Sequence, residues 1–166
     1  MNAKSFNMTL IAIVLLLFLT QQNSESATNW TPPQSIVGNW SGKHLVVVRT
    51  QTNGKYNFTK SPGALNFNII IYSDGKLTGT LGTATFEGCV VYKNRGWIGR
   101  TLNLKTDFVI KGKLVGPIFP EDAIKNKTIS MPLNLENNTL KGSLFQMEET
   151  IDKFPMVDVR LSKEKK

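Results

Sequence analysis

Residues 65–81 read LNFNIIIYSDGKLTGTL, and this stretch decides the fold. In its first half apolar side chains alternate with Asn66 and Asn68, which is the pattern of a strand with one buried face. The pair Asp74-Gly75 then tolerates the positive φ angles of a tight hairpin turn. The second half alternates again around Gly79, so the stretch predicts an antiparallel β-hairpin.

A short pattern with a central glycine recurs three times, at residues 77–81, 114–118 and 140–144. Glycine on the inward face of a strand lets a sheet coil sharply or lets another backbone approach closely. The third copy follows Asn137-Asn138, a second hairpin-turn signal. An alternating strand is also expected at 129–135, where Pro132 predicts a sheet edge or a bulge.

Further strands are expected at residues 40–49, 83–92, 101–105, 107–115 and 156–161. Together these segments predict an all-β fold, a small antiparallel up-and-down barrel of about eight strands. A β-sandwich whose glycines mark bulges is the alternative. Only residues 120–127 are expected to be helical, for one or two turns, with Glu121 and Asp122 favouring the dipole at its start.

The apolar run from Leu10 to Leu19 follows Lys4 and precedes small polar residues, the layout of a secretory signal. It is too short for a permanent membrane anchor, which needs about 20 apolar residues. We therefore expect a signal peptide at 1–26, a loose polar leader at 27–35, one barrel domain at 36–162 and a basic tail at 163–166. The expected location is outside the cytoplasm, extracellular or periplasmic.

The formal net charge of the 166-residue chain is +8. Such a surplus can attract anionic partners, or it can form a solvated basic surface that keeps the protein soluble. No specific nucleic-acid partner is expected, and the oligomeric state stays open. Cys89 is the only cysteine, so no internal disulfide can form, and its apolar neighbours predict a small buried thiol.

Catalysis is not expected. His44 is the only histidine, and neither a metal-ligand spacing nor a glycine-rich phosphate loop occurs. We predict no catalytic residue, no metal and no cofactor. A glycosidase built from two carboxylates is the enzymatic alternative.

The strand expected at 40–49 carries Trp40, Gly42, His44 and Val46 on one face. If Trp40 points into a barrel, His44 does so too, and His44 with Val46 could line a cavity for a small apolar ligand. The alternative is a histidine that belongs to the core and is satisfied by a neighbour.

Gly38-Asn39-Trp40 resembles the Gly-x-Trp that opens the first strand of lipocalins and of related avidin-like barrels. Thr106-Asp107-Phe108 is similar to the lipocalin Thr-Asp-Tyr motif. This resemblance implies that Arg160 packs across the Trp40 ring and closes the barrel base. It also implies an open cup that binds small apolar ligands, in a family that includes inhibitors of secreted peptidases.

Residues 92–100 form a second candidate binding element, because Arg95, Trp97 and two glycines occur together there. The sequence therefore predicts a secreted, non-enzymatic protein that holds a small hydrophobic ligand. The alternatives are a protein-interaction module, such as a secreted peptidase inhibitor, and a carbohydrate-contacting β-sandwich.

Overall fold

The computed structural model describes residues 30–94, 106–123, 126–147 and 153–164. Every regular element in these ranges is a strand. The strands are β1 (Gly38–His44), β2 (Val47–Thr52), β3 (Lys55–Lys60), β4 (Leu65–Ile71), β5 (Lys76–Leu81), β6 (Ala84–Lys93), β7 (Phe108–Val115), β8 (Asn126–Glu136), β9 (Thr139–Met147) and β10 (Lys153–Lys163).

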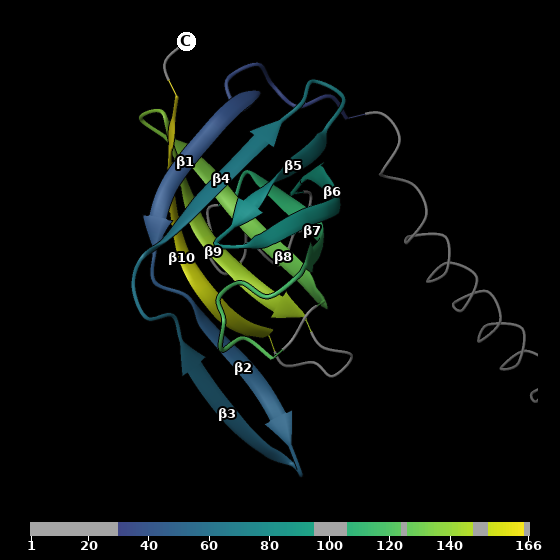
Figure 1. The fold of residues 1–166 in the computed structure, drawn as a ribbon. Helices are drawn as coiled ribbons and strands as arrows, with labels where there is room; N and C mark the ends of the chain where they lie inside the picture. Colours follow the sequence, from purple (N-terminus) through teal and green to yellow (C-terminus); the bar gives the residue numbers. More distant parts are fainter. Residues whose placement is uncertain (1–29, 95–105, 124–125, 148–152, 165–166) are drawn as a thin grey trace, which may run out of the picture. The chain divides into compact units, whose positions relative to one another are not determined.

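Eight strands form a closed antiparallel barrel in the order β1-β10-β9-β8-β7-β6-β5-β4, and β1 pairs with β4 to complete the ring (Figure 1). The predicted all-β up-and-down barrel of eight strands is thus confirmed. The two remaining strands, β2 and β3, pair only with each other and form a separate hairpin between β1 and β4. In Figure 1 this hairpin extends away from one end of the barrel.

Alternation along the strands fills the barrel with apolar side chains. On β4, Phe67, Ile69 and Ile71 are buried while their neighbours Asn66 and Asn68 are exposed. The rings of Phe67 and Phe86 stack inside the barrel, 5.5 Å apart between centroids and 8° from parallel. The largest fully buried side chains are Trp40, Phe67, Phe86, Phe119, Ile36, Ile69, Ile71, Leu81, Ile110, Leu114, Ile118 and Ile129.

The two predicted hairpin turns are present. Gly75 has a φ of 83°, and Asn137 and Asn138 have φ angles of 48° and 59°, which is the pattern of a type I′ turn. Two of the three recurring glycines also lie where another backbone passes. A Cβ at Gly79 would collide with the Asn68 carbonyl oxygen, and one at Gly142 with the Pro132 carbonyl oxygen. The second copy differs, because Gly116 follows the end of β7.

Several details correct the sequence-based expectations. The strand expected at 40–49 is broken after His44, because the chain leaves the barrel there and enters the β2–β3 hairpin. Pro132 does not mark a sheet edge: β8 pairs on both sides, although its pairing with β9 omits residues 131 and 132. The strand expected at 101–105 lies outside the described residues.

One end of the barrel is closed by Trp40, which is completely buried and donates a hydrogen bond of 2.9 Å from Nε1 to the Ile36 carbonyl oxygen. The cation over the Trp40 ring is Lys163, whose Nζ lies 5.3 Å from the ring centroid, and not the expected Arg160. Along β10 every second residue points inward with Leu161, and Arg160 lies on the exposed outer face.

The same Lys163 also donates 2.9 Å and 3.4 Å hydrogen bonds to the Ser35 and Gln34 carbonyl oxygens. Pro32 is buried as well. The second half of the segment expected to be a loose leader therefore packs on the barrel, and the tail expected at 163–166 begins inside β10.

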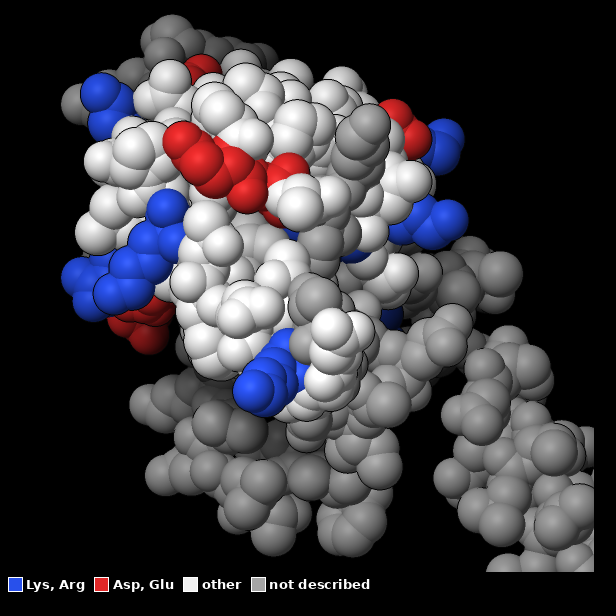
Figure 2. Space-filling view, turned by 60° about the horizontal axis from the view of Figure 1, so that its bottom comes forward, with Lys and Arg blue, Asp and Glu red and all other residues white. Residues whose placement is uncertain are grey.

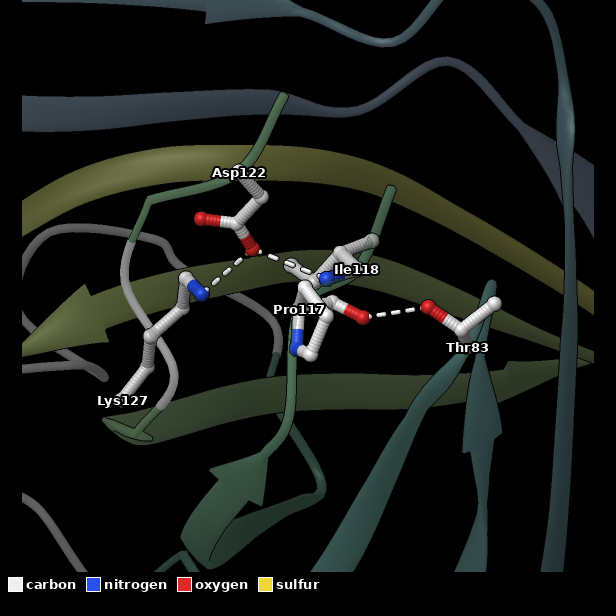
Figure 3. Close-up of polar contacts among 5 residues, drawn as sticks. All are labelled: Thr83, Pro117, Ile118, Asp122 and Lys127. Carbon is white, nitrogen blue, oxygen red and sulfur yellow. Dashed lines mark hydrogen bonds and ion pairs between the residues drawn. The ribbon is translucent and has the colours of Figure 1, made fainter. Parts of the chain in front are cut away.

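The opposite end of the barrel is covered by the connection between β7 and β8. Ile118 and Phe119 are 0% and 1% exposed. The Ile118 carbonyl oxygen accepts a 3.1 Å hydrogen bond from the Thr83 backbone N–H in the β5–β6 turn, and the Thr83 hydroxyl donates to the Pro117 carbonyl oxygen (Figure 3). This connection, residues 116–122, is called the plug below.

A buried ion pair fixes the plug. One carboxylate oxygen of Asp122 lies 2.6 Å from the Lys127 ammonium nitrogen and accepts a 2.9 Å hydrogen bond from the Ile118 backbone N–H (Figure 3). Both charged side chains are inaccessible to solvent. The expectation of a helix at 120–127 is therefore wrong: Lys127 belongs to β8 and points inward, where it pairs with Asp122 instead of capping a helix.

Cys89 is buried, as the sequence predicted, with 2% of its surface exposed. A bulge at Gly88, which has a φ of 58°, shifts the alternation of β6 so that Cys89 points inward. Desolvation raises the pKa of the thiol, so the protonated form is favoured.

Candidate functional site

The barrel interior near His44 is occupied by other side chains. The imidazole meets the Phe67 ring edge-on, with 5.8 Å between ring centroids. Its Nε2 atom is buried without a hydrogen-bond partner and lies above Gly42, where a Cβ would approach it to 2.8 Å. His44 thus shares the inward face with Trp40, as expected, but it packs against an aromatic cluster.

Burial also changes the titration of His44. Desolvation lowers the pKa of the imidazole below its ordinary value, although the backbone of Arg160 and Asp158 and the charge of Asp158 act in the opposite direction. The neutral ring is therefore the favoured form near neutral pH.

Of the other three residues expected at a ligand site, the structure describes only Val46. Val46 is fully buried at the root of the β2–β3 hairpin, where its N–H donates to the Ser61 hydroxyl and its carbonyl oxygen accepts from the Ser61 N–H. Arg95 and Trp97 lie outside the described residues.

A hollow of about 600 Å³ lies on the outer face of β7, β8 and β9. We call it the outer groove. Its apolar lining comes from Val109, Pro132 and Phe145, and two lysines, Lys111 and Lys141, also line it. The side chains that share this lining are Asn94, Thr106, Val109, Lys111, Ser130, Pro132, Asn134, Lys141, Ser143 and Phe145, together with Gly142.

The groove continues along β8. A second hollow of about 590 Å³ shares Lys111 and Ser130 with the first, and a third of about 380 Å³ shares Glu87 and Thr128 with the second. The outward positions of β8 run through all three hollows, at residues 126, 128, 130, 132 and 134. From residue 126 to residue 134 a strand extends over about 26 Å, so the three hollows together suit an elongated ligand.

Small outward residues explain why this face is hollow. Ser130 and Ser143 stand where longer side chains would fill the first hollow, and Gly88 contributes no side chain to the second. The cations differ in their surroundings. Lys141 makes a 2.8 Å ion pair with the exposed Glu136, whereas Lys111 is exposed beside the shared wall of the first two hollows.

The apolar wall and the lysines of the outer groove offer contacts to a bound molecule. Within the described ranges, no group of three His, Cys, Asp or Glu side chains is placed to hold a metal ion. The same ranges contain no helix long and apolar enough to cross a membrane. Comparison with known protein families, curated proteins and solved structures gave no match.

Sequence reasoning missed the outer groove, because its residues occupy the polar positions of strands that were interpreted as solvent-facing. Only the neighbouring positions of Lys111 and Lys113 on β7 and the serines of β8 and β9 could have suggested it. It also missed the buried partnership of Asp122 and Lys127, since both residues were assigned to a short exposed helix.

Proposed function

We propose that this protein is a secreted, non-enzymatic binding protein that holds a small amphiphilic ligand in the outer groove. One observation carries the proposal: the hollow over β7, β8 and β9 has the size of a small-molecule site, and it lies outside the apolar core that the inward side chains of the described strands form. The lipocalin-like or avidin-like relationship belongs to this proposal, with the ligand on the barrel wall rather than in its mouth.

The groove residues favour a particular ligand chemistry. Val109, Pro132 and Phe145 offer apolar contact to a hydrocarbon body, and Lys111 offers a cation to an acidic group at its end. The ligand class that fits is therefore an elongated molecule with one carboxylate, such as a long-chain fatty acid. Because the cation is exposed, we expect affinity to fall as salt concentration rises.

Binding of a fluorescent long-chain fatty acid to the exported protein tests the proposal. The expected result is saturable binding near one probe per chain, weakened about tenfold by Phe145→Ser and by Lys111→Glu, a loss of about 1.4 kcal/mol each. The methyl ester of the probe should bind more weakly to the native protein and should not respond to Lys111→Glu.

Two control variants separate this site from the alternatives. Lys93→Glu changes an exposed lysine of β6 that does not line the groove, and His44→Gln changes the interior. Both should leave the affinity within about twofold, an energy below about 0.5 kcal/mol. Loss of binding in His44→Gln with normal binding in Phe145→Ser would instead favour a ligand inside the barrel. Failure of the probe, with saturable binding of an oligosaccharide, would favour the carbohydrate alternative.

A further inference from the structure

The β2–β3 hairpin has no role in the proposed groove. Its two strands pair over six residue pairs, from Val47 with Lys60 to Thr52 with Lys55. An isolated two-stranded hairpin is marginal in water, so this one depends on its root. Val46 and Val48 are both 0% exposed and anchor that root to the rest of the domain.

The hairpin exposes aromatic side chains on one face. Tyr56 and Phe58 are 41% and 57% exposed, and they alternate on β3 so that they point to the same side. The Arg49 guanidinium carbon lies 4.6 Å from the Tyr56 ring centroid and holds that ring in place. Tyrosine and arginine are the residue types that dominate protein-binding surfaces.

The stretch of sequence that contains the hairpin carries charges of one sign. No Asp or Glu occurs between Thr31 and Ser73, whereas Lys43, Arg49, Lys55 and Lys60 do. Two of these lysines stand at the two ends of β3. A second copy of the same hairpin would meet like charges, which disfavours pairing of β3 with its own copy.

The backbone of β3 also has an edge with which no described strand pairs. In the part of the chain that the structure describes, β3 pairs only with β2. An extended peptide can add to such an edge through main-chain hydrogen bonds, while its side chains meet those of the neighbouring strand. Lysines at edge strands protect against unselective pairing, and they also select for a partner of opposite charge.

We propose that β3 accepts an extended acidic segment of a partner protein as a third strand of the hairpin. Carboxylates of the segment face Lys55, which lies on the opposite face of β3 from Tyr56 and Phe58, and its apolar side chains cover these two rings. A lipid surface fits less well, because the tip of the hairpin is Asn53-Gly54 and the exposed rings lie along its side. A nucleic acid also fits less well, since the basic side chains are scattered around this end of the molecule (Figure 2).

The test uses the exported protein and a dye-labelled peptide that alternates glutamate with valine. Its affinity is measured by fluorescence anisotropy, and the protection of β3 amides is followed by hydrogen exchange. We expect binding with slowed exchange in β3, and at least about tenfold weaker binding for Lys55→Glu and for Phe58→Ser. The same peptide with N-methyl groups on alternate residues should lose binding, because it cannot donate main-chain hydrogen bonds at the edge.

Matched changes elsewhere serve as controls. Lys93→Glu reverses an exposed lysine of β6, and Tyr72→Ser removes an aromatic ring that is 43% exposed after β4. Both should stay within about threefold of the native affinity, and melting temperatures check that all variants fold. The proposal is overturned if Lys93→Glu weakens binding as much as Lys55→Glu, if the N-methylated peptide binds equally, or if only anionic vesicles or single-stranded DNA bind.

Discussion

The buried pair Asp122–Lys127 makes the sharpest stability prediction, because it fixes the plug that closes one barrel end. Lys127→Met removes the ammonium that lies 2.6 Å from the buried Asp122 carboxylate and keeps the 2.9 Å hydrogen bond from the Ile118 N–H. Asp122→Asn keeps an acceptor for that N–H but leaves a buried ammonium without its counter-charge. Each single change should therefore cost about 3–5 kcal/mol of unfolding free energy.

The double variant Asp122→Asn with Lys127→Met contains neither charge and should lie within about 2 kcal/mol of the native protein, because an apolar replacement of a buried pair is often neutral. Urea unfolding followed by tryptophan fluorescence measures all four proteins. Single losses below about 1 kcal/mol, or a double loss equal to the sum of the two, would refute the reasoning, since either result means that the pair is solvated or uncoupled.

Three further predictions concern the barrel. Trp40→Ala should lower the free energy of unfolding by about 3–5 kcal/mol, because it leaves a cavity. Lys163→Ala should cost about 1–2 kcal/mol through the lost contact with the Trp40 ring, and Arg160→Ala less than about 0.5 kcal/mol. Thermal unfolding compares the three variants, and a larger loss for Arg160→Ala than for Lys163→Ala would mean that Arg160 packs on the ring. Because burial lowers the pKa of His44, the unfolded chain binds more protons than the folded protein at mildly acidic pH. The stabilisation from the neutral imidazole should therefore be fully present above pH 6.5 and be lost as the pH falls through the folded-state pKa. His44→Gln should flatten the dependence of stability on pH, and an unchanged dependence would contradict this prediction. Gly112→Ala should destabilise the barrel by about 1–3 kcal/mol, because the new Cβ would collide with Cys89, whereas Gly63→Ala, with nothing within 4 Å of its Cβ, is the control that should not.

Local patterns predicted the barrel well wherever one residue or pair dictates geometry. Asp74-Gly75 and Asn137-Asn138 require turns, and the alternation of residues 65–71 requires one buried face, so these elements did not depend on distant contacts. The hairpin β2–β3 was missed although Asn53-Gly54 is an equally strong turn signal. The apolar run from Leu45 to Val48 had suggested one continuous strand instead.

Long-range register explains the remaining differences. Whether Arg160 or Lys163 reaches Trp40 depends on which face of β10 points inward, and pairing of Trp40 with Lys163 decides it. The burial of Asp122 depends on its ion pair with Lys127, and the strand of Lys127 begins inside the segment expected to be a helix. The outer groove is a property of three adjacent strands, so no single segment of sequence reveals it.

The most direct test of the central claim is nuclear magnetic resonance of the methyl-labelled protein saturated with the fatty-acid probe. Binding in the outer groove predicts intermolecular Overhauser contacts from the probe to the Val109 and Met147 methyl groups, which line the first and the second hollow. Contacts to Ile69, Ile110 or Leu144, which are buried inside the barrel, in place of those to Val109, would contradict it.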